Sequence, residues 1–269
     1  MARWLDVARS LRLAVVLALV LAVGGRAGVA AAELVELTVD SGASSVGATL
    51  AISYLGASDS DTVAHMPFAG VVQADVGLGS DPVHGVVPVS LQFLSGDVSS
   101  SGAQFALQLV SSFVIDISVT LASLLGRFDP ELMPADPPSA AGTASVDLAP
   151  IDLVFDSGTL AMVVEPPGGE PIVMDFAESP LVFALGGSGT VVLTPGTGGL
   201  DVTVTIPVDE IALTSEGGID VELTLFGDLV LRGTIAPQVP ALSPLATLGL
   251  VLLSSVAIVV GGSRALAAR

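Results

Sequence analysis

The chain has 269 residues, with 27 acidic and 8 basic side chains, a formal net charge of −19, no cysteine and no lysine. These numbers exclude a disulfide framework, a cysteine-ligated zinc or iron–sulfur site and a thiol nucleophile, and they argue against a nucleic-acid partner, whose phosphates need clustered lysine and arginine. Because 51% of the residues are hydrophobic and the mean hydropathy is +0.83, the chain is too apolar for a disordered acidic protein, and we expect part of it to meet a membrane.

The charges are unevenly distributed along the chain. Six of the eight arginines lie in the first 26 or the last six positions. Between residues 33 and 238 only Arg127 and Arg232 stand against 26 acids, a net charge of −24. The sequence therefore describes a polyanion between two basic, apolar ends.

The N-terminal end has the three parts of a secretory signal peptide. Three arginines precede an uninterrupted apolar run at 13–23, and the segment that follows, 24–32, ends in the small residues Ala30, Ala31 and Ala32. The pattern predicts a signal peptide over 1–32, with an A-x-A-like site at Ala30 and Ala32 and cleavage before Glu33; cleavage after Ala30 or Ala31 also satisfies the small-residue rule. The alternative is an uncleaved anchor, but the run is short of the ~20 residues that span a bilayer.

The middle of the chain alternates apolar and polar residues with the period of two that is typical of half-buried strands. Runs of about 5–8 residues are separated by glycine- and proline-rich turns, Gly227-Asp228 among them. This pattern predicts an all-β ectodomain over 33–238, an antiparallel β-sandwich. The expected strands are 46–54, 87–93, 105–121, 151–155, 160–164, 172–176, 181–185, 191–193, 200–206, 219–225 and 229–231, with 105–121 forming either one long strand or a hairpin that turns at Ser111-Ser112.

A proline-rich stretch at 128–149 interrupts this alternation. It holds four prolines and is unsuited to the interior of a strand or helix. We expect either an exposed loop or a linker between two halves. One sandwich with a protruding loop is favoured, because halves of roughly 90 residues would each be small domains.

The sequence offers few groups for catalysis. The two histidines, His65 and His84, lie in expected loops, and no Gly-x-Ser-x-Gly nucleophile elbow occurs. We therefore predict no catalytic residues, no obligatory cofactor and a protein that is not an enzyme.

Two acidic segments are candidate calcium ligands. Asp59 and Asp61 lie in one expected loop, and Asp129 and Glu131 lie in another. Each pair places two carboxylates within reach of one hard cation, and calcium takes six to eight oxygen ligands. The alternative is that all four are solvated surface acids.

The C-terminal end predicts a transmembrane helix. Residues 245–262 are 18 uncharged residues, at the lower limit for a membrane span. Arg264 and Arg269 follow them, so the positive-inside rule places the tail in the cytoplasm and the acidic middle outside.

The last 31 residues resemble bacterial sorting signals of the PEP-CTERM type. The motif that precedes the helix is similar to the variant whose hallmark is Ile-Pro-Thr-Leu-Ser; its residues are Val239, Pro240, Ala241, Leu242, Ser243 and Pro244. The chain lacks the Pro-Glu-Pro and the arginine cluster of other variants. The resemblance implies a sorting signal over 239–269 that an exosortase, a membrane transpeptidase, removes. A permanent anchor is the alternative.

Together these features predict an exported protein that is anchored in the inner membrane as an intermediate and then reaches the cell surface or the extracellular space. Its expected partners are signal peptidase, an exosortase-like enzyme and the membrane, and the resemblance implies a structural or adhesive role, with extracellular polysaccharide as a further partner. Two alternatives remain: a surface glycan hydrolase with paired carboxylates, and a calcium- or carbohydrate-binding module.

Overall fold

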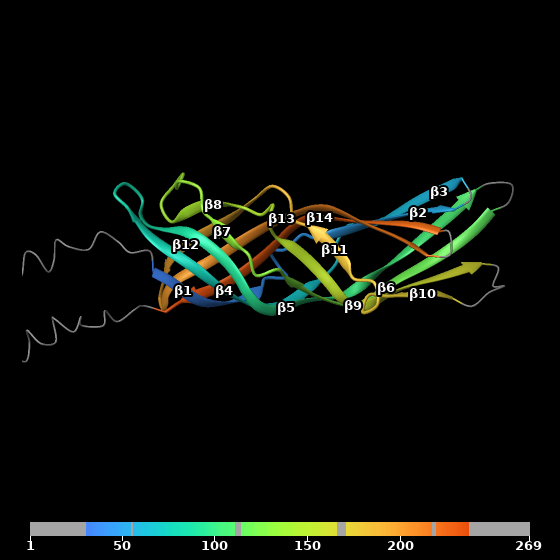
Figure 1. Cartoon of the computed structure of the whole chain (residues 1–269), viewed down its shortest axis with the longest axis horizontal. Coiled ribbons are helices and arrows are strands. Elements are labelled where there is room, and N and C mark those ends of the chain that lie inside the picture. Colours follow the sequence, from blue (N-terminus) through green and yellow to red (C-terminus); the bar gives the residue numbers. More distant parts are fainter. Residues whose placement is uncertain (1–30, 55, 111–113, 166–170, 217–218, 237–269) are drawn as a thin grey trace, which may run out of the picture. The chain divides into compact units, whose positions relative to one another are not determined.

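The computed structural model describes residues 31–54, 56–110, 114–165, 171–216 and 219–236. Strands account for 79% of these residues, none of which is helical, and every strand pairing is antiparallel (Figure 1). The expected all-β antiparallel class is confirmed. Most of the predicted signal peptide and the whole predicted sorting signal, including the helix at 245–262, lie outside the described residues. Within the described ranges no helix has the length and apolarity needed to cross a bilayer.

Fourteen strands belong to one compact unit that ends at Ile235. They are β1 (Ala31–Val39), β2 (Gly47–Tyr54), β3 (Ala57–Val63), β4 (Phe68–Asp81), β5 (Gly85–Val110), β6 (Val114–Phe128), β7 (Leu132–Pro134), β8 (Thr143–Asp147), β9 (Asp152–Glu165), β10 (Ile172–Asp175), β11 (Leu181–Ala184), β12 (Ser188–Gly196), β13 (Gly199–Glu216) and β14 (Ile219–Ile235).

All the strands are hydrogen-bonded into one sheet, which runs in the order β10-β9-β6-β5-β4-β1-β14-β13-β12-β8. The path curls back on itself, because β7 pairs with β5 and Ala135, directly after β7, bridges Val146 of β8. At the other end of the unit, β2 pairs with β14 and β3 pairs with β2. Figure 1 places the β2–β3 hairpin, the β5–β6 hairpin and β10 together at this second end.

The alternating pattern fills a single core. Inward-facing residues of nearly every strand belong to one buried cluster. Its aromatic members link distant strands: the rings of Phe93 and Phe128 stack at 4.5 Å, and Phe155 lies 5.9 Å from Phe183 and 6.4 Å from Phe68. Burying these rings supplies a large part of the hydrophobic free energy of a core. The buried cluster therefore agrees with the half-buried strands that the alternation predicts.

The structure decides one open alternative of the strand pattern and corrects another detail. The segment 105–121 is a hairpin, with Val110 opposite Val114, so the hairpin is the correct alternative. The segments 151–155 and 160–164 are parts of the single strand β9.

Gly227 marks a kink and not the predicted turn. Strand β14 continues through it, with β2 as its neighbour up to Phe226 and β1 from Leu231 onward. The backbone of Gly227 has φ +109°, and a Cβ there would collide with the carbonyl oxygen of Ser45. Glycine is needed because only a residue without a side chain tolerates both conditions.

The proline-rich stretch is neither a protruding loop nor a linker. It contributes β7 and β8, and Met133, Ala144 and Val146 are fully buried. Pro134 has no backbone N–H to donate, which agrees with the shortness of β7. Their apolar residues nevertheless close the gap between β5 and β12.

Candidate functional site

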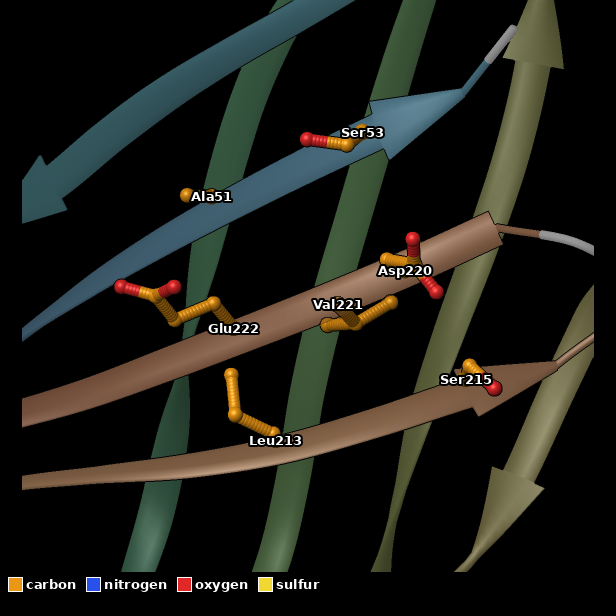
Figure 2. Close-up of a pocket in the computed structure, with 7 residues that line it drawn as sticks. All are labelled: Ala51, Ser53, Leu213, Ser215, Asp220, Val221 and Glu222. Carbon is orange, nitrogen blue, oxygen red and sulfur yellow. The ribbon is translucent and has the colours of Figure 1, made fainter.

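A hollow of the described surface lies on the outer face of β2, β14 and β13 (Figure 2). Its volume is about 470 Å³, and it is open to solvent. In Figure 2 these three strands form one layer, with β5 and β6 crossing behind it. The lining residues are Ala51, Ser53, Leu213, Ser215, Asp220, Val221 and Glu222.

Strand register determines the neighbours of Asp220 and Glu222, the two acids of this hollow. Asp220 is paired with Ser53 on one side and Ser215 on the other, while Glu222 is paired with Ala51 and Leu213. Residues two apart on a strand face the same side, about 7 Å from each other. Three of these four neighbours, Ala51, Ser53 and Ser215, are small, and Figure 2 shows both carboxylates extending from β14 beside them.

The two carboxylates of the hollow, Asp220 and Glu222, can attract cations. Both carboxylates are exposed, so they attract cations but remain hydrated. The sequence analysis did not single out these two acids; alternate acids in the strand 219–225 were the signal that could have found them.

The first predicted calcium segment is a strand and not a loop. Asp59 and Asp61 belong to β3, and their carboxylates accept hydrogen bonds from the backbone N–H groups of Gln108 (2.7 Å) and Ala106 (2.8 Å) in β5. No backbone pairing joins β3 to β5. The two side chains therefore bridge a seam between two strand edges.

The second predicted calcium segment, Asp129 and Glu131, lies between β6 and β7. The backbone N–H of Glu131 donates to the carbonyl oxygen of Asp129 in a tight local turn (2.9 Å). Across the part of the chain that the structure describes, no three histidine or acidic side chains gather closely enough to hold a metal ion. The structure does not bring Asp59, Asp61, Asp129 and Glu131 into one cluster of that kind.

Both histidines lie outside strands, as predicted. His65 is exposed, and His84 lies in the turn between β4 and β5, where its Nδ1 is 3.0 Å from Asp81. The backbone N–H groups of His84 and Val83 donate to the Asp81 carboxylate and hold its pKa below the ordinary value of 3.8. This contact is part of the turn that joins β4 to β5.

The two arginines of the acidic region are both paired. Arg127 forms an ion pair with Asp156, and Arg232 Nε lies 2.8 Å from Asp40 Oδ2. Neither arginine lies in the hollow. Among the described residues, no arginine therefore neutralises the acids of the hollow.

The predicted signal-cleavage site and sorting motif lie at or beyond the ends of the described residues, 31 and 236. Ala32 belongs to β1, where it is paired with Gly77, and Ala31 is paired with Leu78. Ala30 and the motif Val239–Pro244 lie outside the described residues.

Comparisons with known proteins give no match to a family model, to a curated protein or to a solved structure.

Proposed function

We propose that the chain is an exported, non-enzymatic surface protein, in which an acidic antiparallel β-sandwich is delivered by a signal peptide and has a structural or adhesive role. The observation that carries the proposal is the combination of a strand-built unit with an uncompensated acidic surface. In the region 33–238, 26 acids face two arginines, and both arginines are held in ion pairs. Strong negative charge keeps a secreted protein soluble and monomeric.

The sequences of the two ends of the chain support export and sorting to the cell surface. The apolar run at 13–23, with arginines before it and alanines after it, is typical of a secretory signal. Cleavage after Ala30 would leave β1 whole, whereas cleavage after Ala32 would remove its first two residues. The tail 239–269 resembles exosortase substrates, so we propose an intermediate anchored in the inner membrane and a processed product at the cell surface or in the extracellular matrix.

Intact mass of the surface-released protein tests this route. The chain is produced in a bacterium that has an exosortase, and we expect a product without Arg269 whose first residue lies between Ala31 and Glu33. A product that retains Arg269 would show a permanent anchor.

A matched pair of variants separates the motif from its surroundings. Pro240→Ala changes the sorting motif and should leave the tail attached. Pro237→Ala changes a proline outside the motif and should leave processing unchanged.

The hollow favours one second candidate, a calcium- or carbohydrate-binding module. Asp220 and Glu222 are its exposed acids, and their spacing of about 7 Å is also compatible with paired carboxylates in a glycan hydrolase. Their exposure to water favours binding over hydrolysis. Titration with millimolar calcium should produce heat that is lost in Asp220→Asn/Glu222→Gln, and the absence of heat in the unmodified chain would eliminate calcium as its ligand.

A further inference from the structure

The β4–β5 hairpin projects beyond the end of β14, at the opposite end of the unit from the β2–β3 hairpin (Figure 1). Strands β4 and β14 are both antiparallel to β1, so they run in the same direction. Strand β14 ends at Ile235, near the level of Val35, because Gly233 already lies against this residue. Val35 pairs with Ala74, and β4 continues to Asp81, seven residues later. At about 3.3 Å per residue, the hairpin extends about 23 Å further than β14.

The chain itself limits the distance from the end of β14 to the predicted membrane helix. Nine residues, 236–244, lie between Ile235 and the predicted span at 245–262, and nine residues cover at most about 30 Å. The headgroup layer takes about 5–7 Å of this length, because the hydrocarbon core makes up about 30 Å of a bilayer of about 40–45 Å. At most about 23–25 Å therefore separate the end of β14 from the bilayer surface. The projecting hairpin is long enough to cover this distance.

The tip of the hairpin carries the most exposed aliphatic side chain of the described residues. Val83 is 82% exposed, and Val86, on the other side of the turn, is 48% exposed. Asp81 is the single acid of the segment 76–89, although the region 33–238 holds 26 acids. Its Oδ1 accepts hydrogen bonds from the backbone N–H groups of Val83 and His84, both at 2.8 Å. The tip therefore presents valine to its surroundings and turns its one carboxylate back toward the turn.

We propose that this tip contacts the bilayer surface in the anchored form of the protein, with Val83 and Val86 in the headgroup layer. The inference rests on the proposed anchoring by the tail. Two valines give only a weak attraction to a membrane, but a short tether makes the contact intramolecular and so raises the effective concentration of the surface. The unit then stands on the end that bears the β4–β5 hairpin, and its acidic remainder points away from the lipid.

The tether, and not the exposure of valine alone, selects this tip. Val110 and Val114, at the tip of the β5–β6 hairpin, are also exposed, by 63% and 52%. That tip lies at the far end of β5, which has 26 residues and therefore a length of about 80 Å. A unit that stands on the β4–β5 hairpin holds the second tip away from the bilayer, whereas a unit that lies flat brings both tips to it.

Fluorescence quenching by lipids distinguishes these arrangements in the full chain, anchored through its tail in phosphatidylcholine vesicles. Neutral lipid is chosen because anionic lipid would repel the acidic unit. The chain has no cysteine, so one introduced cysteine carries the only fluorophore. Ser80→Cys labels the β4–β5 hairpin, and Ser58→Cys labels an equivalent exposed serine in β3, at the second end of the unit. The quencher is a phospholipid with a spin label in its headgroup.

We expect quenching of the fluorophore at residue 80 and none at residue 58. Equal quenching at the two positions would show a unit that lies flat, and no quenching at residue 80 in vesicle-bound protein would show a free tip. Either result overturns the inference and leaves the anchoring intact. A chain that does not float with the vesicles contradicts the anchoring itself, and with it both proposals.

A matched pair of variants tests the role of the valines. Val83→Ser/Val86→Ser, in the chain labelled at residue 80, should lower the ratio of contacting to free tips about tenfold or more. Val110→Ser/Val114→Ser removes two valines of the other hairpin and should leave the ratio unchanged. Because all four side chains are exposed, melting temperatures should be similar. Unchanged quenching in the first variant would contradict the assignment to Val83 and Val86.

The length of the tether gives an independent test. The insertion of about twenty glycine and serine residues after Gln238 lengthens the connection from nine to about 29 residues, and the effective concentration falls roughly as the −3/2 power of length. We expect the ratio of contacting to free tips to fall about fivefold. Undiminished quenching at residue 80 with the long tether would contradict a contact that depends on tethering.

Discussion

At the scale of single residues, carboxylates of this protein act as hydrogen-bond acceptors for backbone groups that lack a strand partner. Asp59 and Asp61 accept from β5, and Glu210 accepts from the segment between β11 and β12. A backbone N–H without a partner is costly when it is shielded from water. Some of the acids that make the chain a polyanion therefore also hold strand edges together.

The seam between β3 and β5 should be measurable in stability. Asp61→Ala leaves the N–H of Ala106 without its acceptor, and we expect a loss of about 1 kcal/mol in the free energy of unfolding, with a further loss of similar size in Asp59→Ala/Asp61→Ala. Urea unfolding measures both. Asp209→Ala, which changes an exposed acid on β13, is the control; if it costs as much as Asp61→Ala, the bridge contributes nothing.

The carboxyl group of Asp81, in the turn between β4 and β5, should titrate at low pH. The N–H groups of His84 and Val83 lower the pKa of Asp81 below 3.8. A lowered pKa in the folded state means that the stabilisation is complete above the ordinary pKa and is lost as the pH falls through the folded value. Carboxyl NMR should give a midpoint below 3.8 for Asp81, and His84→Ala should move it only slightly because the backbone donor stays. A midpoint at or above 3.8 would contradict this account.

At the scale of the elements, one glycine lets a single strand serve two neighbours. Strand β14 pairs first with β2 and then with β1, and the change occurs around Gly227. The turn that precedes β2 fills the gap, where the Ser44 hydroxyl accepts from the N–H of Val230 (3.0 Å). The kink therefore lets β14 pair with β2 before Gly227 and with β1 after it.

Gly227→Ala should damage this junction. The side chain would occupy the place of the Ser45 carbonyl oxygen in a backbone conformation that only glycine tolerates. We expect a loss of about 2–3 kcal/mol in the free energy of unfolding. The control is Gly198→Ala, where a Cβ has open space. Equal stability of the two variants in urea unfolding would show that β14 adapts without cost.

Elements with a clear alternation were predictable, and those without it were not. Strand β3 has Ser58, Ser60 and Thr62 on its exposed side and aspartates on the other, so no apolar period announces it. It forms because the chain reverses after Tyr54 and β2 supplies its backbone partners. The short strands β7 and β8 lie in the proline-rich stretch, so the sequence pattern did not predict them. They form because β5 and β12 supply their backbone partners.

At the scale of the whole molecule, the dominant feature is uncompensated negative charge. With 26 acids and two arginines between 33 and 238, repulsion opposes the compact state. It is offset by a core that draws on nearly every strand.

Salt should therefore stabilise the protein. Raising ionic strength from 0.01 to 0.15 M shortens the Debye length from about 30 to about 8 Å, and the melting temperature should rise over this interval. Scanning calorimetry in sodium chloride measures it. A melting temperature that falls with salt would mean that ion pairs such as Arg232–Asp40 contribute more than the repulsion.

The sequence by itself determined the all-β class, the inward-facing residues and the charge of the molecule, because a period of two dictates which side chains share a face of a strand. Only the tertiary structure decided the partners of each strand, the closure through β7 and β8, and the bridging role of Asp59 and Asp61. These features depend on contacts between residues far apart in the chain, such as Asp61 with Ala106. No local pattern records such contacts, since the same acids would satisfy the same alternation whether they faced water, a calcium ion or a free backbone N–H.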